Sequence, residues 1–244
     1  MKTISVIIPA YNEEKRLPET LKKWQTFLSH NKDDFLIKEI IIVDDGSTDK
    51  TISVAEFFNN SLPIKTIKIS PNRGKGNAVK TGVKNANSDF ILVYDADAAT
   101  PPEELGKLFF ETKNADFIIG SRIINGAETT MSPRRKFVGK CFHFLCLPLI
   151  PKIKDASCGV KLIKTDIAKK IFERQYIERF AFDIEILWLA KKMNCRIKEV
   201  GVKWDEIPGS KVRVSRDSIE MFFSVLGLYK RAILDKIKNK KINE

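Results

Sequence analysis

The first half of the chain alternates short apolar segments with segments in which apolar residues recur at helical spacing. The apolar segments are rich in Ile, Val and Phe and predict strands at 4–8, 39–43, 64–69, 90–94 and 117–119. The intervening segments predict helices at 14–28, 49–58, 75–86 and 102–112. This alternation predicts an α/β fold in which a mostly parallel sheet carries helices on both faces.

The second half is less regular. Its pattern predicts an amphipathic helix at 137–150, a strand near 160–163, a helix at 182–193, a strand at 196–202 and a long helix at 218–238. We find no internal repeat and no linker rich in Pro, Gly or Ser, so we expect one domain with a C-terminal extension.

Polar residues follow four of the predicted strands. They lie at 9–13, 44–47, 72–76 and 95–97. In an open parallel sheet the ligand binds outside the carboxyl ends of the strands, where the loops converge. We therefore expect these four segments to meet at one binding site.

The segment Asp95-Ala96-Asp97 is the strongest candidate for metal chemistry. Mg²⁺ is usually held by one or two carboxylates together with substrate phosphate oxygens, and a metal there would neutralise charge on a departing diphosphate. Such a triplet is often only a solvated turn, but its position directly after an apolar strand favours function.

Further candidates end the second and third strands. Asp44 is placed to accept hydrogen bonds from a nucleobase, Asp49 suits a helix N-cap, and Asp45 fits either role. Lys75 stands in Arg-Gly-Lys-Gly at a helix start, where free N–H groups favour phosphate, although a plain glycine turn gives the same pattern. Neither G-x-G-x-x-G after the first strand nor a P-loop motif occurs, which argues against a dinucleotide enzyme or an ATPase of that kind.

Basic loop residues are candidates for phosphate contacts. Arg122 follows the fifth strand, Arg134 precedes the amphipathic helix, and Ser210-Lys211 follows Pro-Gly; each could equally be an inert surface residue. Asp183 and Glu185 begin a predicted helix, but residues two apart point to different faces, so at most one addresses a substrate.

Composition adds a charge argument. The 244 residues carry a formal net charge of +12, which favours an anionic partner such as nucleic acid, an anionic membrane or a phosphorylated substrate. Aspartates clustered at strand ends would repel a polyphosphate, so we expect no nucleic-acid partner. The four cysteines lack a CxxC pair and fit a reducing compartment, and we read the first residues as a strand rather than a signal peptide.

Two predicted helices have the residue pattern of helices that lie on a membrane surface. Apolar residues recur at steps of four within 137–150 and form a second stripe within 218–238, and Lys or Arg residues flank both segments. No apolar segment reaches the roughly 18–20 residues that span a bilayer, so we expect peripheral attachment. Packing of both stripes in the core is the open alternative.

The strand-end motifs resemble those of family 2 inverting glycosyltransferases of the A fold. Within the family, the second half resembles the dolichyl-phosphate (polyprenyl-phosphate) β-glucosyltransferase branch. The matching motifs are Phe-His-Phe at 142–144, Cys-Gly-Val-Lys-Leu at 158–162, Glu-Arg-Phe-Ala-Phe-Asp-Ile-Glu at 178–185 and Trp-Asp-Glu-Ile-Pro-Gly-Ser-Lys at 204–211. The similarity covers about 4–211.

The resemblance implies a role for each matching residue. The residues that would bind the nucleotide sugar are Pro9, Tyr11, Glu13, Asp44, Lys75, Asp95 and Asp97, with Pro9, Tyr11, Glu13 and Asp44 around the nucleobase. Asp97, with Asp95 beside it, would hold Mg²⁺ or Mn²⁺. The catalytic set would be Asp97, Arg122, Arg134 and Lys211, while Asp183, Glu185 and Ser210 are acceptor-contact or base candidates.

The implied reaction is transfer of glucose from UDP-glucose to a polyprenyl phosphate, with inversion and release of UDP. The mannosyl branch has a Gln two residues after the second Asp of its motif, where this chain has Ala99, which argues against that branch. The alternatives are a GDP-mannose-dependent transferase and a related enzyme acting on a hydroxyl acceptor. We expect a catalytic domain at 1–214, divided into a nucleotide-binding half (1–120) and an acceptor half (121–214), and a basic amphipathic helix and tail at 215–244. The expected location is the cytoplasmic face of a membrane.

Overall fold

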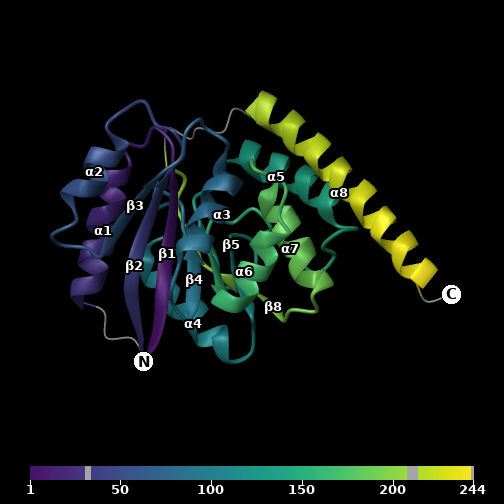
Figure 1. The fold of residues 1–244 in the computed structure, drawn as a ribbon, viewed down its shortest axis with the longest axis horizontal. Helices are drawn as coiled ribbons and strands as arrows, with labels where there is room; N and C mark the ends of the chain where they lie inside the picture. The colour runs from purple at the N-terminus through teal and green to yellow at the C-terminus, as the bar shows by residue number, and fades with distance from the viewer. Residues whose placement is uncertain (31–33, 208–213, 243–244) are drawn as a thin grey trace.

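The computed structural model describes residues 1–30, 34–207 and 214–242. Its centre is a seven-stranded sheet with the order β3-β2-β1-β4-β7-β5-β8 (Figure 1). The strands are β1 (Lys2–Ala10), β2 (Phe35–Asp44), β3 (Ile64–Lys68), β4 (Phe90–Val93), β5 (Phe117–Ser121), β7 (Lys161–Lys164) and β8 (Ile197–Gly201). Two further short strands, β6 (Glu128–Thr129) and β9 (Lys203–Trp204), pair with each other in parallel.

The sheet is parallel except at β7. β1 pairs in parallel with β2 and β4, β2 with β3, and β5 with β8, whereas β7 lies antiparallel to both β4 and β5. The predicted mostly parallel fold is therefore confirmed. The reversed direction of β7 and the β6–β9 pair were not part of the prediction.

Helices pack on both faces of the sheet. The helices of the described residues are α1 (Leu17–His30), α2 (Thr51–Phe57), α3 (Lys75–Asn85), α4 (Leu105–Phe110), α5 (Pro133–Cys146), α6 (Thr165–Glu173), α7 (Phe182–Lys192) and α8 (Val214–Ile242), with 3₁₀ turns at Pro102–Glu104 and Glu111–Lys113. Gly82 of α3 packs on Ile7, whereas Phe109 of α4 contacts Phe90, the register partner of Ile4. Since Ile4 and Ile7 are three residues apart in one strand, they point to opposite faces, and α3 and α4 cover opposite sides.

The predicted segments differ from the structure mainly at their ends. The amphipathic helix predicted at 137–150 is α5, which begins four residues earlier because Pro133 suits the first turn, and ends at Cys146. The long C-terminal helix also extends beyond its predicted limits on both sides. Helix α6 was missed.

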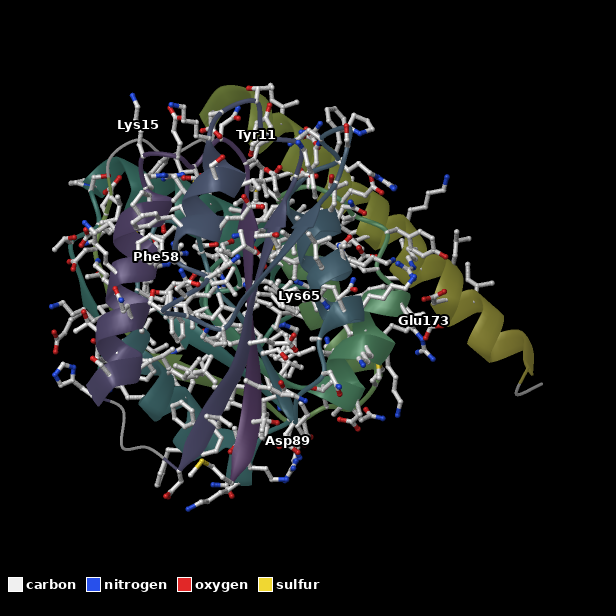
Figure 2. All side chains as sticks on the ribbon, turned by 60° about the vertical axis from the view of Figure 1, so that its left-hand side comes forward. Tyr11, Lys15, Phe58, Lys65, Asp89 and Glu173 are labelled. Atoms are coloured by element: carbon white, nitrogen blue, oxygen red, sulfur yellow. The ribbon has the colours of Figure 1, made fainter. Side chains whose placement is uncertain are left out.

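The carboxyl ends of the parallel strands meet at one edge of the sheet. Figure 2 shows Tyr11 and Lys15, which follow β1, at the top of the molecule and Asp89 at the opposite end. The polar segments predicted to converge therefore share the Tyr11 edge.

Helix α8 lies along the outside of the domain next to α5 and α7 (Figure 1). One face packs on the body through the buried Val225 and Leu228, and the Tyr229 hydroxyl donates to the Leu145 carbonyl at 2.6 Å. The other face leaves apolar side chains exposed, among them Phe223 at 64%. One face of the predicted stripe therefore packs against the domain, and the other face is exposed to solvent.

Helix α5 shows the same division. Cys146 is buried, whereas Phe137 and Phe144 are 69% and 70% exposed. Of the helices in the described part of the chain, none combines the length and apolar character needed to cross a membrane.

Candidate active site

The Asp95-Ala96-Asp97 segment turns sharply after β4. Ala98 adopts a positive φ of 47°, and the Ala99 N–H donates to Asp97 Oδ1 at 3.2 Å. The turn is fixed to α1, because the Thr20 hydroxyl donates to the Ala96 carbonyl at 2.7 Å. Both aspartates therefore occupy defined positions beyond the strand end.

Lys75 pairs with the first of these aspartates. Its Nζ lies 2.6 Å from Asp95 Oδ1 and 6.0 Å from the centre of the Phe182 ring. Burial lowers the pKa of Lys75, but the carboxylates of Asp95 and then Asp183 outweigh burial and hold it above its ordinary value. Burial likewise opposes ionisation of Asp95, yet Lys75 keeps the pKa of Asp95 below its usual range.

Asp97 has a different environment. Burial, followed by the neighbouring charge of Asp95, raises the pKa of Asp97 above its ordinary value. Its Oδ2 is 3.5 Å from Nη1 of Arg16, a weak contact. A cation bound at Asp97 would relieve its repulsion with Asp95.

Arg16 belongs to the site although no sequence motif marked it. Its Nε donates to Glu13 Oε2 at 2.7 Å, and Nη2 pairs with the second carboxylate oxygen. Glu13, predicted to lie beside the nucleobase, is buried and directs Arg16 towards Asp97. The preceding residues differ in exposure, since Pro9 is buried at the end of β1 and Tyr11 is 40% exposed.

Asp44, the last residue of β2, and the next aspartate, Asp45, make different contacts. Asp44 is fully buried; its Oδ1 accepts from the Ser47 N–H at 3.0 Å, while Oδ2 is buried without a hydrogen-bond partner. Asp45, whose role the sequence left open, accepts from the N–H groups of Arg73 and Gly74 at 3.0 and 2.6 Å and shapes that loop.

Asp49 was expected to be the N-cap of α2. The N-cap residue is instead Lys50, which makes no side-chain capping bond. Asp49, one residue earlier, accepts from the Thr51 N–H at 3.0 Å, so it still satisfies an amide of the first turn.

Sequence motifs from the first and second halves of the chain pack closely against each other. Gly74 precedes α3 with a φ of 114°, and a Cβ there would lie 2.7 Å from the Glu178 carbonyl oxygen. A Cβ on Gly159, which follows Cys158 in the second-half motif, would lie 1.8 Å from Asp95 Oδ2. Glycine is therefore required at both positions by close approach.

A buried ion pair lies beneath Asp95. Lys161 of β7 has no exposed surface; its Nζ lies 2.7 Å from Asp183 Oδ1 and donates to the Cys158 carbonyl at 2.5 Å. Asp183, a candidate base, is thus held by a buried ammonium group at the start of α7.

Arg122 is held by a carboxylate and a ring. Asp155 accepts from Arg122 Nε at 2.8 Å and Nη2 at 2.7 Å, and also from the Arg122 N–H at 2.8 Å. The guanidinium lies 5.4 Å from the Trp204 ring centre. Asp155 was not identified from the sequence, since it stands outside any strand-end pattern.

The remaining candidates lie apart or outside the described residues. Glu185 is fully buried and binds Arg231 of α8 at 2.6 Å, so its contacts argue against a role as a base. Arg134 lies in the first turn of α5. Ser210 and Lys211 lie outside the described residues.

The donor set at Asp97 suits a hard divalent cation that shares its ligands with a substrate. Within 1–30, 34–207 and 214–242, no group of three or more His, Cys, Asp or Glu side chains could hold a metal ion. One or two carboxylates completed by diphosphate oxygens is a usual Mg²⁺ arrangement, and Asp97, with Asp95 beside it, is the group that would supply the carboxylates.

Comparison with known proteins identifies the family. Residues 5–172 match the description "Glycosyl transferase family 2". A dolichyl-phosphate beta-glucosyltransferase of Dictyostelium discoideum is 38% identical over 246 residues, covering 95% of this chain and 75% of that protein. The enzymes of that name from Drosophila melanogaster and Homo sapiens are 39% and 35% identical, covering 86% of this chain and 69% and 70% of their own lengths.

Solved structures share the fold. Glucosyl-3-phosphoglycerate synthase from Mycobacterium tuberculosis, in complex with Mn²⁺, UDP and glucosyl-3-phosphoglycerate, superposes with a TM-score of 0.68 at 17% identity, covering 92% of this chain and 77% of that one. S. aureus TarS in complex with UDP-GlcNAc gives a TM-score of 0.60 at 21% identity, covering 93% and 65%.

These comparisons confirm the resemblance drawn from the strand-end and second-half motifs. The chain belongs to glycosyl transferase family 2, among relatives that are dolichyl-phosphate β-glucosyltransferases.

Proposed function

We propose that the chain transfers glucose from UDP-glucose to a dolichyl or other polyprenyl phosphate. The observation that carries this proposal is its 38% identity, over 95% of its length, to a dolichyl-phosphate β-glucosyltransferase. In the reaction, a phosphate oxygen of the lipid attacks the anomeric carbon of glucose. The bond from that carbon to the β-phosphate oxygen breaks, its electron pair leaves with UDP, and the configuration inverts.

The donor nucleoside would lie at the carboxyl ends of β1 and β2. The buried, unpartnered Oδ2 of Asp44 is costly unless a donor reaches it, and the N–H of a nucleobase edge is such a donor. Tyr11, 40% exposed beside it, offers a ring for base contact. Lys75 and Asp95, already paired at 2.6 Å, would face the ribose and diphosphate.

Asp97 would hold Mg²⁺ or Mn²⁺ together with the donor diphosphate. A bound divalent cation would neutralise charge that develops on the leaving UDP. Arg16 lies close enough to Asp97 to orient its carboxylate, and Glu13 fixes Arg16 in turn. Arg122 adds positive charge, and Asp155 fixes the direction of its guanidinium group. Arg134 and Lys211 remain proposed phosphate contacts.

A phosphate acceptor needs little help from a protein base. A phosphate monoester has a second pKa of about 6, so at neutral pH its oxygen is largely ionised. Asp183 is paired with the buried Lys161, and Glu185 with Arg231, so both carboxylates have countercharges. A hydroxyl acceptor would instead require a free base, and these contacts favour the phosphate.

The lipid acceptor requires access to a membrane surface. α5 and α8 expose Phe137, Phe144 and Phe223, and Lys136 and Lys140 are exposed on α5. Apolar side chains beside lysines suit the headgroup region of an anionic bilayer. We therefore propose peripheral attachment through α5 and α8, on the cytoplasmic face.

One assay tests donor, acceptor and reaction together. The protein is incubated with Mn²⁺, a polyprenyl phosphate and, in separate reactions, UDP-glucose, UDP-GlcNAc or GDP-mannose, and the glycolipid is identified by mass. We expect a hexosyl polyprenyl phosphate from UDP-glucose. A product only with GDP-mannose, or only with a hydroxyl acceptor supplied in place of the lipid phosphate, would contradict the proposal.

A further inference from the structure

The loop between α6 and α7, residues 174–181, packs against the start of α3, where Lys75 lies. A Cβ on Gly76 would lie 2.6 Å from the Ile177 carbonyl oxygen, and the Asn77 N–H donates to the Glu178 carbonyl at 2.9 Å. Because the start of α3 rests directly on this loop, the loop's position sets the position of Lys75.

Glu185 holds this loop from beneath. Its carboxylate accepts from the Tyr176 N–H, at 3.0 Å to Oε2, and from the Ile177 N–H at 2.7 Å. The Gln175 side chain closes the turn by donating from Nε2 to the Ile177 carbonyl at 2.7 Å. A fully buried carboxylate thus fixes two consecutive amides of the loop.

Arg231 places a positive charge beside the buried carboxylate of Glu185. Arg231 Nη1 donates to Glu185 Oε1 at 2.6 Å, and Nη2 donates to the Arg174 carbonyl at 3.2 Å. Its guanidinium lies 4.6 Å from the Tyr176 ring centre and 5.2 Å from that of Trp188. Arg231 therefore contacts both the Glu185 carboxylate and the 174–181 loop that this carboxylate holds.

We infer that Glu185 and Arg231 are positioning residues for donor binding, which connect the surface helix α8 to the diphosphate side of the site. The contacts run from Arg231 to Glu185, from Glu185 to the 174–181 loop, and from the loop to the start of α3. The inference rests on the proposed function for the identity of the donor. It assigns Glu185 a task other than that of a base.

A positioning role and a purely structural role predict different kinetics. Loss of stability lowers the fraction of folded enzyme, which reduces the apparent kcat and leaves the donor KM unchanged. Displacement of the loop moves Lys75 in every folded molecule and weakens donor binding, which raises the KM for UDP-glucose and the Kd for UDP.

The test compares Glu185→Gln with a charge-neutral pair, Glu185→Gln combined with Arg231→Met. The pair avoids leaving a buried charge without a partner, so it keeps the comparison open if a single change fails to fold. Asp235→Asn is the matched control, because the Lys192–Asp235 ion pair also joins α7 to α8 but at the last turn of α7. Thermal melting reports folding, calorimetry with UDP and Mn²⁺ reports binding, and glucosyl transfer reports KM and kcat.

We expect both Glu185 variants to raise the UDP Kd and the UDP-glucose KM about tenfold, with kcat within about twofold of wild type. Asp235→Asn should leave all three constants unchanged. Variants that fold and match Asp235→Asn in Kd and KM would overturn the inference. If wild type binds UDP but transfers no glucose, the proposed function fails, while a weaker UDP Kd in the variants still supports the positioning role.

Discussion

Gly159 lies so close to Asp95 that a Cβ on it would stand 1.8 Å from the carboxylate oxygen Oδ2. Gly159→Ala must therefore push Asp95 away from its place beside Lys75. We expect a loss of about tenfold or more in kcat/KM for UDP-glucose and weaker UDP binding in calorimetry. The control is Gly139→Ala on α5, where a Cβ would meet nothing within 4 Å. Unchanged donor binding in Gly159→Ala would show that the placement of Asp95 does not matter.

Asp97→Ala should remove metal-dependent transfer. Since Asp97 is the carboxylate proposed to hold the cation, we expect kcat to fall by at least about a hundredfold, with little recovery at high Mn²⁺. Glucosyl transfer measured across a Mn²⁺ series checks this. Asp89→Asn, at the opposite end of the molecule in Figure 2, should leave transfer intact. Full activity of Asp97→Ala with metal present would refute the assignment.

Asp116 should make stability depend on acid pH. Hydrogen bonds from Arg196, followed by those from Lys164, hold the pKa of Asp116 well below its usual range. A carboxyl whose folded pKa is depressed stabilises the protein above its unfolded pKa of about 3.9, and this contribution is lost as the pH falls towards the folded value.

We therefore expect Asp116→Asn to lower the free energy of unfolding by about 1 kcal/mol at pH 7. The difference from wild type should shrink between about pH 5 and pH 2. Urea unfolding at several pH values measures it, with the exposed Glu56→Gln on α2 as control. If the difference in unfolding free energy between wild type and Asp116→Asn stays constant over this pH range, the depressed pKa of Asp116 is not its cause.

Exposed phenylalanines on α5 and α8 should govern membrane binding. Phe137→Ser combined with Phe223→Ser removes two rings that are 69% and 64% exposed, so folding should be unaffected. Each ring entering the interface contributes about 1.5–3 kcal/mol, so vesicle binding should fall at least about tenfold. Flotation with anionic vesicles measures this. The control is Phe57→Ser, whose ring is 81% exposed on α2, on the opposite side of the molecule from α8 in Figure 1, and which should bind like wild type. Equal flotation of all three proteins would exclude this surface.

The sequence pattern was sufficient to predict the strands within residues 1–120. The runs of Ile and Val in β1 and β2 are buried almost throughout, which is why they read as continuous apolar strands. The polar segments after these strands share one edge because parallel strands end together. The pairing of Asp95 with Lys75 follows from that convergence, although the motif alone does not reveal it.

The sequence pattern did not predict the burial of a side chain or the direction of a strand where these depend on residues distant in the sequence. Lys161 begins β7 and has no exposed surface, because its ammonium group lies against Asp183 of α7, a contact that the local pattern does not reveal. Periodicity carries no sign of strand direction, so the reversal of β7 was invisible. Arg16 and Asp155 lie outside strand-end motifs, and only their contacts with Asp97 and Arg122 place them at the candidate site.

The packing of α8 on the domain limits where the protein can be truncated for experiments. A truncated protein ending at residue 214 would lose Arg231 and leave the Glu185 carboxylate without its countercharge in the interior. It would also uncover the apolar surface that Val225 and Leu228 now cover. The boundary expected from the sequence at 214/215 lies at the start of α8, which begins at Val214, so expression of the catalytic part should retain the whole helix.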